Sequence, residues 1–181
     1  MAQVPANSQT VLRPQDLVVL LRLALEKDNS PSYAALGSEL GLTASETHAA
    51  VQRAINAKLA QKRANGRASV VRSALKDFVQ YGARYCFPAC RGGMSRGMPT
   101  GYAAAPLRDQ IRQGNDPPPV WPSKNGTVRG IAMLPLYPSV PDAATRNPQL
   151  GELLALFDAV RAGNAREQAM AMAMLEERLT Q

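Results

Sequence analysis

The sequence is poor in the residues on which most catalytic and metal sites depend. It contains 2 cysteines, 1 histidine and only 5% aromatic residues. A structural zinc site takes four ligands, usually from two Cys or His pairs, and Cys86 and Cys90 have no second pair to complete one. His48, the only histidine, has no nucleophile and no orienting acid at a recognisable spacing. We therefore expect a protein that is not an enzyme and that uses no metal and no cofactor.

Long apolar runs are missing as well. No run approaches the roughly 18–20 residues that a membrane-spanning helix needs. The first ten residues have neither the basic start nor the apolar core of a signal peptide. Without an export signal, the two cysteines are expected to be reduced thiols. The sequence thus predicts a cytoplasmic protein that makes no membrane contact.

The chain carries an excess of positive charge, and the excess is concentrated. The formal net charge is +7. Between residues 58 and 76 no acidic residue interrupts the basic ones, which are Lys58, Lys62, Arg63, Arg67, Arg72 and Lys76. A basic run of this kind suits contact with nucleic-acid phosphates. The alternative is a solvated surface that keeps the protein soluble.

The stretch from Tyr33 to Leu59 reads as two short helices joined by a tight turn. Apolar residues recur at helical spacing up to Leu40, and Gly41 follows where a helix end favours a left-handed residue. Thr43 then begins a second helix, with Glu46 three residues later to complete a capping box. This second helix is expected to extend to about residue 59.

The second helix has two distinct faces. Val51, Ala54, Ile55 and Leu59 share one face, and the other carries Ser45, His48, Ala49, Gln52 and Asn56. Short polar side chains of this kind are able to reach base edges in a major groove.

A hairpin and a further helix are expected after this pair. Asn65-Gly66 is a strong hairpin signal, because both central residues of a type I′ turn need positive φ. The flanking strands are rich in alanine, so a plain loop is the alternative. Ser69 is expected to cap a helix from Val70 to about Tyr81, with Gly82 ending it.

With an earlier helix at about residues 15–27, this order of elements resembles the winged helix-turn-helix of bacterial DNA-binding regulators of the MarR-like kind, over residues 12–80. The resemblance implies sequence-specific binding of double-stranded DNA through a recognition helix at about 43–59 and a basic wing at about 60–69. It also implies a homodimer, because one recognition helix reads only a few base pairs. The expected DNA contacts are Thr43, Ser45, His48, Ala49, Gln52, Arg53, Asn56, Lys58, Lys62, Arg63, Arg67 and Arg72.

The remainder, residues 83–181, is expected to form a second, loop-rich α+β region. A short strand is expected near residues 84–87, with a second strand near 127–134 that could pair with it. Between them, the glycine-rich stretch from Arg91 to Gly101 is expected to be irregular. It matches neither the G-x-x-x-x-G-K-[ST] nor the G-x-G-x-x-G phosphate-binding motif, but Arg91, Arg96 and Thr100 are candidates for a ligand or phosphate site. The alternatives are a second DNA contact, a docking surface, or a loop whose glycines serve turns.

Two terminal helices, at about 149–162 and 165–179, are expected to form a hairpin with a wide apolar stripe. That stripe could close a homodimer, dock another protein or complete the core. The fold is therefore predicted to be mainly α with small β elements, with a DNA-binding domain at 12–82 and a second region at 83–181. The leading hypothesis is a transcriptional regulator, in particular a repressor, whose second region senses a ligand or holds the dimer. The alternative is a protein-binding adaptor, such as an autoregulating antitoxin that neutralises a partner protein through its C-terminal half.

Overall fold

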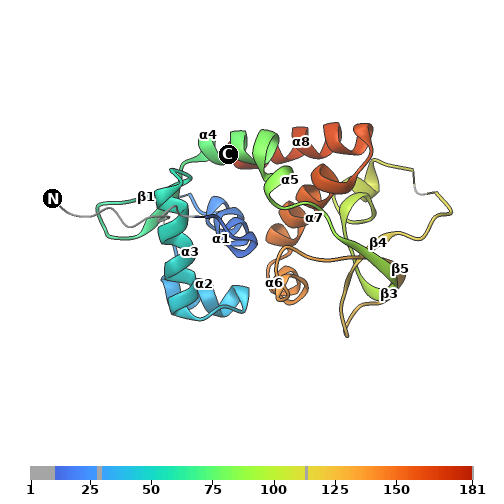
Figure 1. The fold of residues 1–181 in the computed structure, drawn as a ribbon, viewed down its shortest axis with the longest axis horizontal. Helices are drawn as coiled ribbons and strands as arrows, with labels where there is room; N and C mark the ends of the chain where they lie inside the picture. Colours follow the sequence, from blue (N-terminus) through green and yellow to red (C-terminus); the bar gives the residue numbers. More distant parts are fainter. Residues whose placement is uncertain (1–10, 28–29, 113, 181) are drawn as a thin grey trace.

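The computed structural model describes residues 11–27, 30–112 and 114–180. It is a mainly helical α+β fold with small sheets (Figure 1). The hairpin of β1 (Ala60–Lys62) and β2 (Ala68–Val70) lies toward one end, the three-stranded sheet lies at the other, and helix α1 (Pro14–Ala24) lies between them. One hydrophobic core includes buried side chains from Leu17 in α1 to Leu179 in the last helix. The two regions expected from the sequence therefore share a core.

The two short helices form as the sequence predicts. Helix α2 (Tyr33–Leu40) ends at Gly41, whose φ of 70° is the left-handed conformation expected there. Helix α3 (Ala44–Asn56) begins with the predicted capping box. The Thr43 Oγ1 atom accepts from the backbone N–H of Glu46 at 3.1 Å, and Glu46 Oε2 accepts from the Thr43 N–H at 2.8 Å. The end of α2 and the start of α3 were thus readable from capping chemistry, whereas α3 ends at Asn56, before the expected end near residue 59.

The predicted hairpin is present, but its turn is not type I′. Strands β1 (Ala60–Lys62) and β2 (Ala68–Val70) pair antiparallel. The Gly66 N–H donates to the Arg63 carbonyl, and the Arg63 N–H donates to the Arg67 carbonyl. Gly66 has a φ of 76°, whereas Asn65 has no positive φ. This is a type I turn followed by a glycine bulge, the usual form of a three-residue hairpin loop.

The next helical segment starts later and runs further than expected. Ser69 lies in β2 and pairs with Gln61, so it cannot cap a helix. Helix α4 (Arg72–Asp77) continues through a π-helical turn (Phe78–Gly82) into α5 (Ala83–Cys86). The expected stop at Gly82 and the expected strand at 84–87 are both wrong, because the π-turn carries the helix past the glycine. The boundary expected between residues 82 and 83 therefore lies inside continuous helical structure.

Three strands close into a small barrel. Strand β3 (Arg91–Pro99) pairs antiparallel with β4 (Pro119–Pro122) and with β5 (Val128–Met133), while β4 and β5 pair in parallel. The strand expected near 127–134 is confirmed, but it pairs with β3 and β4. The glycine-rich stretch is mostly a strand, not an irregular loop. A Cβ on Gly97 would lie 2.0 Å from the Trp121 carbonyl oxygen, so glycine is needed where the barrel closes tightly.

The last three helices are α6 (Val140–Arg146), α7 (Pro148–Ala162) and α8 (Ala165–Thr180). The predicted terminal pair is confirmed, and α7 packs on α8. Every residue of α7 from Leu153 to Val160 is buried. Helix α7 also contacts α1, and α8 contacts α4. The apolar stripe thus completes the core of the single chain.

Candidate functional site

The outer face of α3 lies at one end of the molecule, on the side away from the barrel (Figure 1). Thr47, Ala50 and Val51 are buried on its inner face, which packs on α1, α2 and β1. Ser45 and His48 are exposed on the outer face, as the sequence predicted. The C-terminal helices and the barrel pack elsewhere, so this face is open to a large partner.

His48 rests against Tyr33, a residue that the sequence did not single out. Their rings meet edge to face, with centroids 5.2 Å apart. The Tyr33 hydroxyl is buried and has no hydrogen-bond partner among the described residues, and the same holds for Gln52 Nε2. Gln52 therefore lies on the predicted face but does not present its amide nitrogen outward. A buried polar atom without a partner is costly, so a small movement that satisfied it would be favoured.

Arg53 is a structural residue in this fold. Its Nε and Nη2 atoms donate to the two carboxylate oxygens of Asp16 at 2.7 and 2.6 Å. Asp16 is fully buried in α1 and also accepts from the backbone N–H of Arg13. The hydrogen bond to Asp16 raises the pKa of Arg53. The Arg53 guanidinium therefore joins α3 to α1, and two of its nitrogens are already engaged in the fold.

Most of the basic run is also engaged within the chain. Arg63 donates to the Lys27 carbonyl at 3.0 Å, and Arg67 donates to the Ser30 carbonyl. Arg72 donates to the carbonyls of Leu179 and Glu26 at 3.0 and 3.2 Å. Arg72 therefore ties the end of α8 to the segment that follows α1, and its guanidinium is engaged in the fold.

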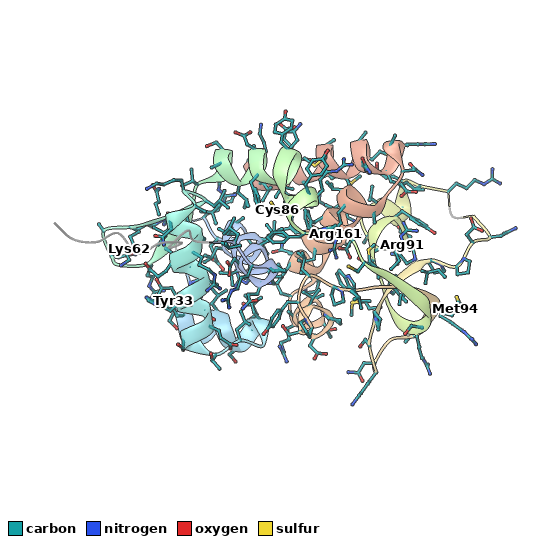
Figure 2. The ribbon with its side chains drawn as sticks, viewed as in Figure 1. Tyr33, Lys62, Cys86, Arg91, Met94 and Arg161 are labelled. Carbon is teal, nitrogen blue, oxygen red and sulfur yellow. The ribbon has the colours of Figure 1, made fainter. Side chains whose placement is uncertain are left out.

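Two lysines of the run project outward. Lys58 and Lys62 are exposed, and neither side chain has a hydrogen bond or ion pair with any described residue. Figure 2 places Lys62 at the same end of the molecule as Tyr33. Of the other predicted contacts, Asn56 is exposed, Ala49 is half-buried, and the Thr43 hydroxyl is occupied by Glu46 at 2.8 Å.

The three candidates in the glycine-rich stretch do not form one site. Thr100 is buried and donates to Asp158 Oδ2 at 2.7 Å. Arg96 is exposed and donates to the Gly126 carbonyl at 2.8 Å. Arg91 alone lines a pocket, where its Nη2 atom donates to the Ala162 carbonyl at 2.8 Å.

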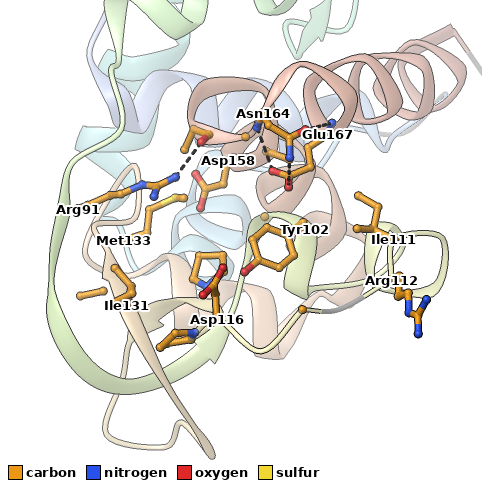
Figure 3. Close-up of a pocket in the computed structure, with 18 residues that line it drawn as sticks. Arg91, Tyr102, Ile111, Arg112, Asp116, Ile131, Met133, Asp158, Asn164 and Glu167 are labelled. Atoms are coloured by element: carbon orange, nitrogen blue, oxygen red, sulfur yellow. Dashed lines mark hydrogen bonds between the residues drawn. The ribbon is translucent and has the colours of Figure 1, made fainter.

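That pocket has a volume of about 750 Å³ and lies between the barrel and the junction of α7 with α8 (Figure 3). Its polar lining includes Tyr102, Asp116, Asp158, Asn164 and Glu167, and its apolar lining includes Ile111, Ile131 and Met133. The sequence did not reveal this pocket, because its walls come from segments far apart along the chain.

Asp158 connects the pocket to the core. It is 1% exposed, and its Oδ2 atom accepts from Thr100 and from Trp121 Nε1, the latter at 2.6 Å. Arg161 donates to Oδ1 at 2.8 Å and also donates to the Leu134 carbonyl at 2.9 Å. Burial raises the pKa of Asp158, against the opposing effect of these donors. This network joins α7 to the barrel.

No family model, curated protein or solved structure matches this chain. Its functional residues are therefore assigned from their geometry and chemistry.

The remaining candidate chemistry is sparse. Within the described ranges, His, Cys, Asp and Glu side chains form no group of three that could hold a metal ion. Cys86 and Cys90 are exposed free thiols. Among the same residues, no helix is long and apolar enough to cross a bilayer.

Proposed function

We propose that this chain is a sequence-specific DNA-binding transcriptional regulator, acting as a repressor. In this proposal α2, the turn at Gly41 and α3 form a helix-turn-helix, and the β1–β2 hairpin is its wing. The observation that carries the proposal is the exposed polar face of α3, with Ser45 and His48 outward, flanked by the free ammonium groups of Lys58 and Lys62.

The chemistry of this face suits a major groove. The groove of B-DNA is wide enough for an α-helix, and short polar side chains read base edges there. Ser45 and His48 can each donate or accept a hydrogen bond. Ala49 lies beside them and can approach a thymine methyl group closely. The inner face of α3 holds the helix rigidly, because Thr47, Ala50 and Val51 are buried.

Phosphate contacts are expected to come from fewer residues than the charge run suggested. Lys58 and Lys62 are exposed, and Arg67 is exposed with one nitrogen bound to a backbone carbonyl. Arg53, Arg72 and Lys76 hold the fold together instead, the last through a 2.9 Å ion pair with Glu176. We therefore assign base contacts to Ser45, His48, Ala49 and Asn56, and to Gln52 once its buried amide turns outward. We assign phosphate contacts to Lys58, Lys62 and Arg67.

We further propose that two copies act together on DNA, because one such helix reads only a few base pairs. The apolar side chains of α7, with Leu175 and Leu179 of α8, are buried within one chain, so we expect the dimer contact to come from another surface. The adaptor hypothesis, in which the C-terminal half binds a partner protein, is the alternative, and docking through the terminal helix pair would have to use the part of that pair that lies outside the core.

Selection of bound sequences from random duplex DNA tests the proposal. A regulator should enrich a single motif, and the motif should be palindromic if two copies bind. Ser45→Ala combined with His48→Ala should then reduce discrimination between the motif and random duplex by about 1–3 kcal/mol. Ser73→Ala, on the exposed face of α4, is the control and should leave the discrimination between the motif and random duplex unchanged. A selection that enriches no motif contradicts the proposal.

A further inference from the structure

The pocket between the barrel and the α7–α8 junction lies outside the proposed DNA-binding face and has the build of a ligand site. Its volume of about 750 Å³ falls in the range of small-molecule pockets. Ile131 and Met133 of β5 form one wall, and Ala159 and Ala162 of α7 form another. These small and aliphatic residues leave room for an apolar body.

A buried carboxylate faces this space. Figure 3 shows Asp158 among the residues that line the pocket, whereas its cationic partner Arg161 is not among them. Arg161 donates to Asp158 through Nε and to the Leu134 carbonyl through Nη2. Asp158 Oδ1 accepts only the Arg161 Nε–H among the described hydrogen bonds, so it can accept another donor from the pocket.

The other acidic groups surround a half-buried aromatic ring. Burial raises the pKa of Tyr102, the charges of Glu167 and Asp116 raise it further, and Arg91 opposes them. Glu167 and Asp116 thus place two carboxylates within electrostatic reach of Tyr102, and Arg91 places one opposing charge there. Carboxylates beside an aromatic face favour a bound cation.

The basic groups of the lining lie at its edges. Arg91 is exposed and donates to the Ala162 carbonyl at the end of α7. Arg112 is exposed, and Figure 3 shows its side chain directed away from the pocket. Arg112 therefore leaves the pocket open, and the Arg91 guanidinium is held at the end of α7 by its hydrogen bond to the Ala162 carbonyl.

We propose that this pocket binds a small organic cation, namely a primary amine with an apolar body. Its ammonium group lies on the acidic side formed by Asp116, Asp158 and Glu167, against Tyr102. Its apolar body lies against Ile131 and Met133. The proposal does not depend on DNA binding.

Trp121 provides a direct readout of this site. It is the only tryptophan of the chain, and its Nε1–H donates to Asp158 at 2.6 Å. A ligand that contacts Asp158 should therefore change the fluorescence of Trp121. Three probes of similar size are titrated into the full chain at constant ionic strength: 2-phenylethylamine, 2-phenylethanol and 3-phenylpropionate. We expect a saturable change with the amine in the millimolar range or below, and weaker or no response with the alcohol and the carboxylate. No saturable response to the amine, or an equal or stronger response to either other probe, overturns the proposal.

Paired variants locate the binding. Asp116→Asn removes an exposed charge that has no hydrogen bond or ion pair among the described residues. Glu167→Gln removes a second charge and keeps a side chain able to complete the capping box with Asn164. Together they should weaken amine binding about tenfold, since each lost charge pair near the surface contributes only modestly. Glu177→Gln, elsewhere on α8, is the control and should leave the affinity for the amine unchanged. Unweakened binding by the double variant, with the fold verified by circular dichroism, also overturns the proposal.

Discussion

Replacing Arg53 with alanine should lower the free energy of unfolding by about 3 kcal/mol. We expect DNA binding by this variant to weaken only because less of the protein is folded. The variant leaves the carboxylate of Asp16 buried without the two hydrogen bonds that it receives at 2.6 and 2.7 Å. Breaking one partner of a buried ion pair typically costs about 3–5 kcal/mol. The lower end applies here, because the Arg53 side chain is 18% exposed and the Arg13 N–H remains bonded to Asp16.

Urea unfolding followed by circular dichroism measures this loss, and thermal unfolding supports it. For a chain of this size, about 3 kcal/mol corresponds to a fall in melting temperature of roughly 6–12 °C. Asp16→Asn combined with Arg53→Met removes both charges and should recover much of the lost stability. Lys62→Ala, which removes an exposed charge without a partner, should stay within about 0.5 kcal/mol of the native protein. A fully stable Arg53→Ala protein that no longer binds its DNA motif would refute this reasoning.

Two further predictions concern the contacts between the N-terminal and C-terminal regions, and a third concerns the outer face of α3. Glu39 accepts hydrogen bonds from Arg22 and from Asn147, and although burial opposes them they lower its pKa below the ordinary value of 4.5. The native protein should therefore be more stable than Glu39→Gln above pH 4.5, and this difference in unfolding free energy should disappear as the pH falls through the folded pKa of Glu39. Urea unfolding of both proteins across this pH range measures the difference. A difference that grows on acidification contradicts the prediction. Deleting residues from Asn147 onward should give an insoluble or unfolded chain, because α7 is buried in the shared core. A truncated chain that is folded and soluble, as measured by circular dichroism and light scattering, would contradict this prediction. Gln52→Met should change the free energy of unfolding by no more than about 1 kcal/mol, because the native amide nitrogen has no hydrogen-bond partner among the described residues. The same variant should reduce discrimination between the motif and random duplex by about 1–3 kcal/mol. Anisotropy titrations measure this discrimination, and an equal loss of affinity for both duplexes would exclude a base contact.

Local signals predicted the N-terminal elements well. The capping box at Thr43 and Glu46 and the left-handed Gly41 each depend on residues within a few positions of one another. The hairpin followed from Asn65-Gly66, although its turn type did not, because a glycine bulge and a type I′ turn share the same residue preferences.

The sequence could not predict contacts that join distant segments. Arg53 carries the same charge as the exposed Lys58 and Lys62, so the sequence does not distinguish them. Arg53 joins two helices only because the fold places Asp16 of α1 next to it. The glycines of β3 suggested turns, whereas Gly97 serves the close approach of Trp121 in the barrel. The pocket was hidden for the same reason, since Tyr102, Asp158 and Glu167 meet only after folding.

The salt dependence of duplex binding tests the proposed DNA-binding face most directly. Three phosphate contacts, from Lys58, Lys62 and Arg67, predict a slope of log K against log salt concentration of about −3. Lys58→Asn combined with Lys62→Gln should bring the slope to about −1, and asparagine tolerates the φ of 63° found at position 58. Lys124→Gln, on an exposed turn of the barrel, should leave the slope unchanged. Binding that is absent at low salt, or a slope that the paired lysine substitutions do not alter, would contradict the account.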